Sequence, residues 1–328
     1  MYENELRVAI EAVRKASRMC QKVQAELTSA ETLAKKDKSP VTVADFGAQA
    51  VIGLELAREF PDDPLVGEES AGFLRTDEGA PIREQVVGRV QAILEGTDEA
   101  TVLDAIDRGA HEGGASGRHW TLDPIDGTKG FLRGEQYAVA LALIENGEVV
   151  LGVLGCPNLP HDMANPDAGI GCLFHGVRGQ GARMAKLEGS DEVEVAVTTI
   201  DDPTQASFCE SVGSGHSSHS HSAQIAEELG VQAEPFRIDS QCKYAAVARG
   251  NASIYLRLPT RADYEEKIWD HAAGWAVITE AGGSVTDVDG KPLDFSIGRT
   301  LRDNKGVIVT NGKLHDRTIA AVKKVLGR

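Results

Sequence analysis

Two apolar segments joined by a short polar turn constrain the fold most strongly. Residues 137–144 (YAVALALI) and 149–154 (VVLGVL) flank the tetrapeptide Glu145-Asn146-Gly147-Glu148. Asn-Gly between two apolar runs is a strong signal for a tight β-hairpin. The sequence therefore predicts that these two segments are neighbouring antiparallel strands.

Helical and strand patterns alternate around this hairpin. Apolar residues recur every three or four positions from Leu6 to Leu27, which predicts one long helix. Further helices are expected at residues 44–60, twice within 81–107, and at 269–281 and 314–326; further strands are expected at 65–70, 252–258 and 307–309. This alternation predicts an α/β protein (α+β layered) in which helices are layered on sheets.

The length of the chain predicts two domains. A chain of 328 residues exceeds the size at which one hydrophobic core tends to divide. The segment 156–169 (CPNLPHDMANPDAG) is rich in Pro, Asn and Gly and offers the boundary. We expect an N-terminal α+β domain of residues 1–157, which carries most candidate metal ligands, and a C-terminal α/β domain of residues 158–328.

The charge excludes one class of partner. The net charge is −16, and a protein that binds nucleic acid polymers by electrostatics needs a basic face. A small anionic substrate remains compatible, provided that metal ions or a few local cations hold it. We expect a monomer or a weak homodimer.

The chain has no apolar run of about 18 residues and no visible signal peptide, so no membrane association is expected. Its five cysteines form no CxxC pair, and their number is odd. This usage favours a reducing compartment and a soluble intracellular protein. The cytoplasm is the first expectation, and an organelle is the alternative if a transit sequence has been removed.

The candidate chemistry concentrates in residues 120–131 (WTLDPIDGTKGF). Asp123 and Asp126 lie three residues apart around Pro124, which disfavours regular helix. We expect a tight turn on which the two carboxylates converge on a hard cation, Mg²⁺ or Mn²⁺ rather than zinc. A turn that merely prefers Asp, Pro and Gly is the alternative.

The neighbouring groups can complete such a site. The carbonyl of Ile125 is free to join the ligands, Gly127 loosens the following turn, and the hydroxyl of Thr128 can position a water molecule.

Further acidic residues stand at predicted element ends. Glu68 and Glu69 end an apolar run, Asp270 starts a helical pattern, and Asp45 precedes an apolar helix. Each has an alternative reading. Glu68 and Glu69 could be a solvated charge pair, Asp270 an N-cap, and Asp45 part of a capping box. Together they indicate function, because α/β folds place functional groups at strand ends and helix starts.

Several motifs resemble a known family. The segments LVGEES, WTLDPIDGTKGFLRGEQYAVALALI and KIWDHAAGWAVITEAGGSVTD resemble the lithium-sensitive, magnesium-dependent phosphatases of the inositol monophosphatase superfamily. Within it, SPVTVADFGAQAV, GHSSH, DSQCKY, IYLRLP and DGKPLDF are similar to the 3′(2′),5′-bisphosphate nucleotidases of plants and fungi. The two helices expected within 81–107 lengthen the stretch from Glu68 to Asp123, as in these nucleotidases. The resemblance implies a sugar-phosphatase-like fold of alternating α/β/α/β/α layers.

The resemblance also implies roles for the acidic residues. Two or three Mg²⁺ ions would be held by Glu68, Asp123, Asp126 and Asp270 with the carbonyl of Ile125. Mn²⁺ would substitute and Li⁺ would inhibit. Asp45 and Thr128 would activate or orient a water molecule that attacks the phosphate in line, without a phosphoenzyme, and Glu69 has no assigned role.

On the substrate side, the resemblance implies contacts with a small nucleotide by Gly127, Thr128, His216, Ser240, Lys243 and Arg257. A guanidinium and an ammonium group both suit phosphate oxygens. The implied reaction is hydrolysis of the 3′-phosphate of adenosine 3′,5′-bisphosphate, with 3′-phosphoadenosine 5′-phosphosulfate as a second substrate and a place in sulfur metabolism.

Alternatives stay open at this point. An inositol polyphosphate 1-phosphatase is the nearest other enzyme, and a non-catalytic sensor of phosphoadenosine is the alternative of another class. A zinc site at His216, His219 and His221 is a minor alternative because no matched ligands flank it. A disulfide between Cys156 and Cys172 under oxidation is also open, since the sequence gives no distance between them.

Overall fold

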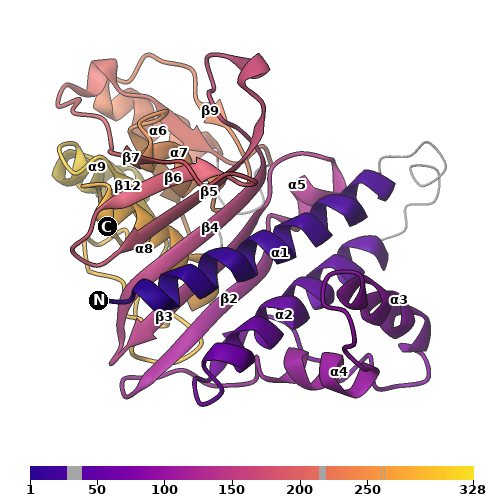
Figure 1. Cartoon of the computed structure of the whole chain (residues 1–328). Helices are drawn as coiled ribbons and strands as arrows, with labels where there is room; N and C mark the ends of the chain where they lie inside the picture. The colour runs from indigo at the N-terminus through magenta and orange to yellow at the C-terminus, as the bar shows by residue number, and fades with distance from the viewer. Residues whose placement is uncertain (28–38, 214–218, 260, 262) are drawn as a thin grey trace.

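A seven-stranded sheet crosses the first part of the structure, a computed structural model that describes residues 1–27, 39–213, 219–259, 261 and 263–328 (Figure 1). Its strands follow the chain order, with β1 parallel to β2 and every later pair antiparallel. They are β1 (Leu65–Gly67), β2 (Arg118–Asp126), β3 (Ala138–Glu145), β4 (Glu148–Pro160), β5 (Ile170–Val177), β6 (Ala182–Lys186) and β7 (Glu192–Val195).

The predicted hairpin is confirmed as β3 and β4. Asn146 and Gly147 form the turn with φ of 52° and 80°. Positive φ at both central residues matches the twist of the flanking strands, which explains the Asn-Gly pair.

Helices cover both faces of this sheet. In β3, Val139, Leu141 and Leu143 face a core shared with α1 (Glu3–Leu27) and α2 (Ser39–Glu59). The alternate residues Ala140 and Ile144 face a second core, shared with α7 (Cys242–Ala248) and α8 (Ala272–Glu280). Since strand side chains alternate between faces, β3 is buried on both sides.

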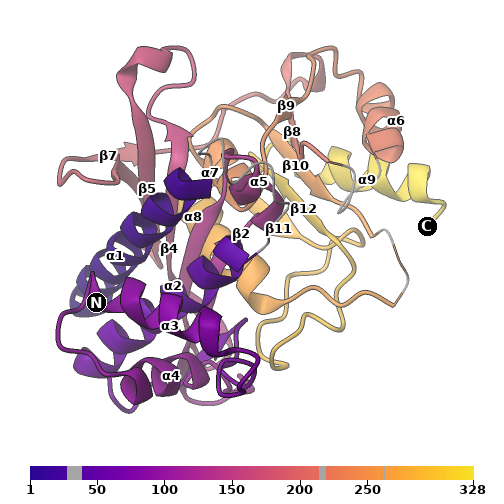
Figure 2. The same ribbon diagram turned by 90° about the vertical axis from the view of Figure 1, so that its right-hand side faces the viewer.

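A second sheet lies beyond α7 and α8 (Figure 2). Its five strands run in the order β11-β12-β10-β8-β9, namely β11 (Ser284–Thr286), β12 (Val307–Thr310), β10 (Ile254–Arg257), β8 (Phe208–Glu210) and β9 (Phe236–Arg237). Tyr255 and Val309 face α7 and α8, whereas Ile254 and Ile308 face a third core with α6 (His219–Leu229) and α9 (His315–Leu326). The layers are therefore α/β/α/β/α, as the resemblance implied.

The two further predicted helices are α3 (Ala80–Gln91) and α4 (Glu99–Asp107), which lie beside α2 (Figure 1). The predicted domain boundary at residues 157/158 falls inside β4, and the strands that follow it complete the first sheet. The division of the chain at this position remains a prediction.

Cys156 and Cys172 are register partners on β4 and β5, and both are buried free thiols. Among the residues that the structure describes, every helix falls short of the length or apolar character that a bilayer crossing requires.

His119 on β2 is buried without a hydrogen-bond partner for its Nε2 atom. Burial, with a smaller contribution from the neighbouring His111, lowers its pKa from 6.5 to about 4. The unfolded chain then binds the proton more readily than the folded chain between these values.

We therefore expect the free energy of unfolding to fall as the pH drops from about 6.5 to about 4, by on the order of 3 kcal/mol from this residue. Urea unfolding at several pH values measures this loss, and His119→Phe should show a correspondingly smaller one. An unchanged pH dependence in the variant would contradict the assignment.

Candidate active site

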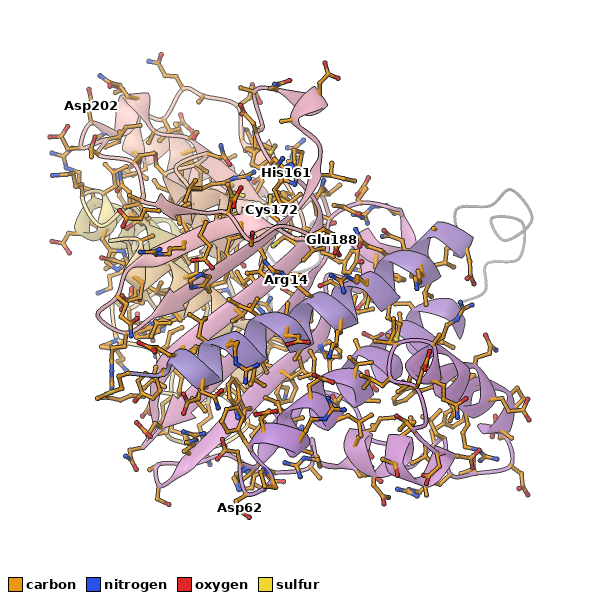
Figure 3. The ribbon with its side chains drawn as sticks, in the orientation of Figure 1. Arg14, Asp62, His161, Cys172, Glu188 and Asp202 are labelled. Atoms are coloured by element: carbon orange, nitrogen blue, oxygen red, sulfur yellow. The ribbon has the colours of Figure 1, made fainter. Side chains whose placement is uncertain are left out.

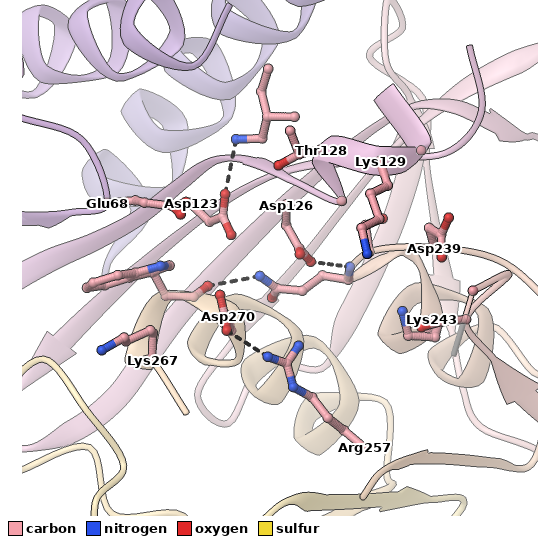
Figure 4. A pocket seen from close by; sticks show the side chains of 18 of the residues that line it. Glu68, Asp123, Asp126, Thr128, Lys129, Asp239, Lys243, Arg257, Lys267 and Asp270 are labelled. Carbon is pink, nitrogen blue, oxygen red and sulfur yellow. Dashed lines mark hydrogen bonds and ion pairs between the residues drawn. The ribbon is translucent and has the colours of Figure 1, made fainter. Parts of the chain in front are cut away.

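One cavity of about 360 Å³ collects the acidic residues that the motifs single out (Figure 4). It opens where β1 and β2 end and where α5 (Thr128–Leu132) and α7 begin, beside the short helix η3 (Ile268–Asp270). Its walls include Glu68, Asp123, Ile125, Asp126, Gly127, Thr128, Ser240, Lys243, Arg257 and Asp270.

Parallel pairing brings the first two carboxylates together. Gly67 at the end of β1 pairs with Leu122 on β2, so Glu68 follows its strand beside Asp123. The carboxyl ends of parallel strands meet at one edge of a sheet, which is where α/β proteins bind ligands.

The expected tight turn at residues 123–126 is replaced by an irregular strand. β2 runs through Pro124 to Asp126, and its register with β3 shifts between Asp123 and Asp126. The irregularity accommodates Pro124, which has no backbone N–H to donate to the neighbouring strand. The backbone N–H of Ile125 donates to Asp123 Oδ1 at 3.1 Å, which fixes that carboxylate.

Gly127 follows with φ of 90° and starts α5. A Cβ atom at this position would lie 2.7 Å from Ser240 Cβ, so only glycine fits. This close approach places Ser240, whose own φ is 67°, against the backbone at Gly127, directly after Asp126.

The alternative reading of Asp45 as part of a capping box is wrong, because α2 begins at Ser39 and Asp45 lies within it. The residue is half-buried within the helix, and burial, Glu69 and Glu68 raise the pKa of its carboxyl well above the usual value. Among the described residues, Asp45 is outside the set that lines the cavity, whereas Thr128 is exposed in it. Helix α2 contacts α5, which carries Thr128.

Like charges dominate the electrostatics of the cavity. Burial, followed by Asp270, raises the pKa of Glu68 to about 7 and that of Asp126 to about 6. Burial and Glu68 raise the pKa of Asp123 well above its usual value. Carboxylates crowded in this way favour the binding of a cation, and their oxygen atoms suit Mg²⁺ or Mn²⁺ rather than zinc.

Asp270 differs from the other carboxylates because it already has a cation. The guanidinium of Arg257 contacts Asp270 Oδ2 at 3.0 Å and Glu266 Oε2 at 2.7 Å, and Glu266 also contacts His271 Nε2 at 3.1 Å. Burial alone would raise the pKa of Glu266, but Arg257 and His271 lower it to about 2.

Glu266, Asp270 and His271 are also close enough to one another to hold a metal ion. Because Arg257 already pairs with both carboxylates, we interpret this group as an ion-pair network. The alternative reading of Asp270 as an N-cap is wrong, because His271 precedes α8 and Asp270 ends η3.

Lys243 is buried at the opposite wall, with its Nζ atom 5.1 Å from the centre of the Tyr255 ring. Burial lowers the pKa of Lys243. The positive charge of Lys243 in turn lowers the pKa of Asp126, which opposes the increase that burial causes there. Ser240 is buried beside Lys243, and its Oγ atom accepts a hydrogen bond from the N–H of Cys242 at 3.2 Å.

His216 lies outside the described residues, so the structure gives it no position. The zinc alternative at His216, His219 and His221 falls partly on the same undescribed segment.

Sequence reasoning missed several cavity residues. Lys129 and Gln241 lie in the TKGF and DSQCKY motifs, of which only Thr128, Ser240 and Lys243 were predicted to be site residues. Lys267 directly precedes η3. Glu266 offered no signal, because its importance depends on the approach of Arg257.

Comparisons with known proteins agree with this geometry. Residues 1–326 match the inositol monophosphatase family. The chain is 48% identical to the 3′(2′),5′-bisphosphate nucleotidase of Oryza sativa, an alignment that covers 99% of the chain and 95% of the relative. It is 45% identical to the nucleotidase of the same description from Schizosaccharomyces pombe, over 100% of the chain and 97% of the relative.

Solved structures share the fold at lower identity. The inositol monophosphatase of Anabaena superposes with a TM-score of 0.63 at 20% identity, covering 98% of this chain and 96% of that one. The IMPase of Thermotoga maritima gives a TM-score of 0.63 at 21% identity, covering 99% and 98%.

Asp123→Asn tests whether the acidic cavity holds a cation. Because Asp123 is only 3% exposed among like charges, the variant should unfold without metal at a temperature no lower than the parent's. Mg²⁺ at 100 times its dissociation constant should stabilise the parent by about 2.7 kcal/mol, and the variant far less.

Thermal unfolding with and without Mg²⁺ measures both effects. The exposed Asp104, changed to Asn, serves as the control and should keep the Mg²⁺ response. Equal Mg²⁺ stabilisation of parent and Asp123→Asn would contradict a role for Asp123 in binding the ion.

Proposed function

The chain belongs to the inositol monophosphatase family, and we propose that it is a 3′(2′),5′-bisphosphate nucleotidase that hydrolyses adenosine 3′,5′-bisphosphate to AMP and phosphate. 3′-Phosphoadenosine 5′-phosphosulfate would be a second substrate of the same site. The observation that carries the proposal is one cavity that combines the carboxylates with two cations, the buried Lys243 and the half-buried Arg257, which contacts Asp270.

The acidic wall fits Mg²⁺ because its side-chain donors are all carboxylate oxygens. Glu68, Asp123, Asp126 and Asp270, with the Ile125 carbonyl, would hold two or three ions, Mn²⁺ would replace them, and Li⁺ would inhibit. Bound Mg²⁺ supplies positive charge that offsets the repulsion between the substrate phosphate and these carboxylates and makes a nearby water molecule more acidic.

The remaining residues would act on water and substrate. Thr128 Oγ1 would orient the attacking water molecule, and the Asp45 carboxylate would receive its proton. The bond from the water oxygen to phosphorus forms as the bond to the 3′ oxygen of the ribose breaks, and that oxygen takes up a proton as it leaves. No covalent phosphoenzyme is needed.

The cationic wall would bind the rest of the nucleotide. Lys243 would act as a point charge and Arg257 as a forked donor for the second phosphate, beside Ser240, Gly127 and His216. Arg257 would reach this phosphate while it remains paired with Glu266, which keeps its guanidinium charged and oriented.

A phosphate-release panel tests the substrate class. With Mg²⁺ present, adenosine 3′,5′-bisphosphate and 3′-phosphoadenosine 5′-phosphosulfate should release phosphate faster than inositol 1,4-bisphosphate and inositol 1-phosphate, and sub-millimolar Li⁺ should inhibit. Faster release from inositol 1,4-bisphosphate would favour an inositol polyphosphate 1-phosphatase. No release from any substrate would favour a non-catalytic sensor.

Lys243→Ala and Arg257→Ala test recognition of the second phosphate. Each should raise KM for adenosine 3′,5′-bisphosphate by roughly tenfold or more, since a hydrogen bond to a charged group contributes about 1.5–3 kcal/mol. KM for 3′-AMP, which lacks that phosphate, should change much less.

Steady-state kinetics with the two substrates give this comparison. Lys243→Ala is the cleaner variant because Arg257→Ala also leaves Glu266 and Asp270 unpaired. Lys313→Ala, on the surface, should alter neither KM. Equal increases for both substrates would refute the assignment.

A further inference from the structure

Gln241 links two acidic residues that come from distant parts of the chain. It directly precedes α7, is only 2% exposed, and lies in the wall of the cavity. Its backbone N–H donates to Asp126 Oδ2. The side chain of Gln241 reaches in the other direction, to the segment that carries Asp270.

That second connection uses both ends of the side-chain amide. Gln241 Nε2 donates to the carbonyl of Trp269 at 2.9 Å, and Gln241 Oε1 accepts from the N–H of Gly274 at 3.0 Å. Trp269 directly precedes Asp270, and Gly274 lies in the first turn of α8. One residue therefore ties the Asp126 carboxylate to the backbone on both sides of Asp270.

The surroundings leave Gln241 little freedom to move. Ser240 packs against Gly127, where a Cβ atom would lie 2.7 Å away, and a Cβ atom on Gly274 would lie 2.3 Å from the Tyr244 ring. These close contacts hold one end of α7 against the backbone at Gly127, which follows Asp126, and the helix itself against α8.

We propose that Gln241 is a positioning residue that sets the spacing of Asp126 and Asp270 and thereby the affinity of the site for divalent cations. Two carboxylates repel each other unless a cation lies between them, so groups that fix the backbone beside each of them help to impose their spacing. A buried amide can do this, because it donates and accepts without adding charge. Groups of this kind around a metal site typically change its affinity about 10- to 100-fold when they are replaced.

The inference rests on the proposed metal site and does not depend on the identity of the substrate. Gln241→Met keeps the length of the side chain and removes both side-chain hydrogen bonds. Gln241→Asn keeps the amide but shortens its reach, and it is measured as well in case Gln241→Met does not fold. Both variants should bind Mn²⁺ and Mg²⁺ about 10- to 100-fold more weakly.

Asn311→Leu is the matched control. Asn311 is also buried, donates to the carbonyl of Ile200 at 2.7 Å and accepts from the N–H of Leu314 at 3.1 Å, but it lies outside the lining of the cavity. Its replacement should lower stability to a similar degree and leave cation affinity within about twofold of the parent, because it loses comparable bonds away from the carboxylates.

Calorimetric titration of the substrate-free protein with Mn²⁺ and with Mg²⁺ gives the affinities, and thermal unfolding without metal gives the stabilities. Affinities of both Gln241 variants within twofold of the parent would overturn the inference, whatever their stabilities. Equal weakening by Asn311→Leu would overturn it too, because the effect would then be a general consequence of lost stability.

These titrations use no nucleotide, so their result is separate from the substrate panel. A parent that binds Mg²⁺ but does not hydrolyse adenosine 3′,5′-bisphosphate would refute the proposed function and leave the role of Gln241 to be judged by the titration. At saturating Mg²⁺, KM of the variants for a substrate that the parent hydrolyses should stay within about twofold, because Gln241 acts through the carboxylates. A raised KM with unchanged cation affinity would assign Gln241 to the substrate and overturn the inference.

Discussion

Repulsion among carboxylates gathered in one cavity is the constraint on which the rest of the structure depends. Burial, and after it the charges of neighbouring carboxylates, raise the pKa values of Glu68, Asp123 and Asp126, so folding gathers like charges away from solvent. Neutral polar side chains hold the framework against this force.

Gln49 provides the clearest example outside the cavity wall. Its fully buried amide donates to the carbonyls of Glu69 and Ile106 at 2.7 and 2.8 Å and accepts from the N–H of Glu69 at 3.0 Å. Arg299 donates to the carbonyls of Gly67, Gly109 and His111 from the other side. The short strand β1 therefore presents Glu68 from a backbone fixed by side chains of α2 and of the C-terminal part of the chain. A rigid frame of this kind preserves a spacing that only a bound cation makes favourable.

The fold and the proposed specificity have different structural origins. The two inositol monophosphatases of known structure share the layered architecture at about one-fifth identity, whereas the nucleotidases of Oryza sativa and Schizosaccharomyces pombe align over nearly the whole chain at 48% and 45% identity. The carboxylates belong to the ends of β1 and β2 and to η3, elements of the layered fold itself. Lys243 and Arg257 belong to α7 and β10, and both side chains line the same cavity as the carboxylates.

The sequence alone determined the central hairpin, the first helices and the choice of candidate acidic residues. The Asn-Gly hairpin, the long amphipathic first helix and the short apolar run before Glu68 are local patterns, and local patterns are set by side-chain periodicity and turn chemistry. Tertiary structure decided what depends on contacts between distant segments. Proline and aspartate at residues 123–126 suggested a turn, but pairing with β3 extends β2 through them. Asp45 and Asp270 resembled helix caps, yet one lies inside α2 and the other pairs with Arg257. Gln241 belongs to the DSQCKY motif, but its role carries no local signal. Its place between Asp126 and Trp269 exists only because α7 packs between two parts of the chain, and hydrogen bonds over such separations leave no period in the sequence.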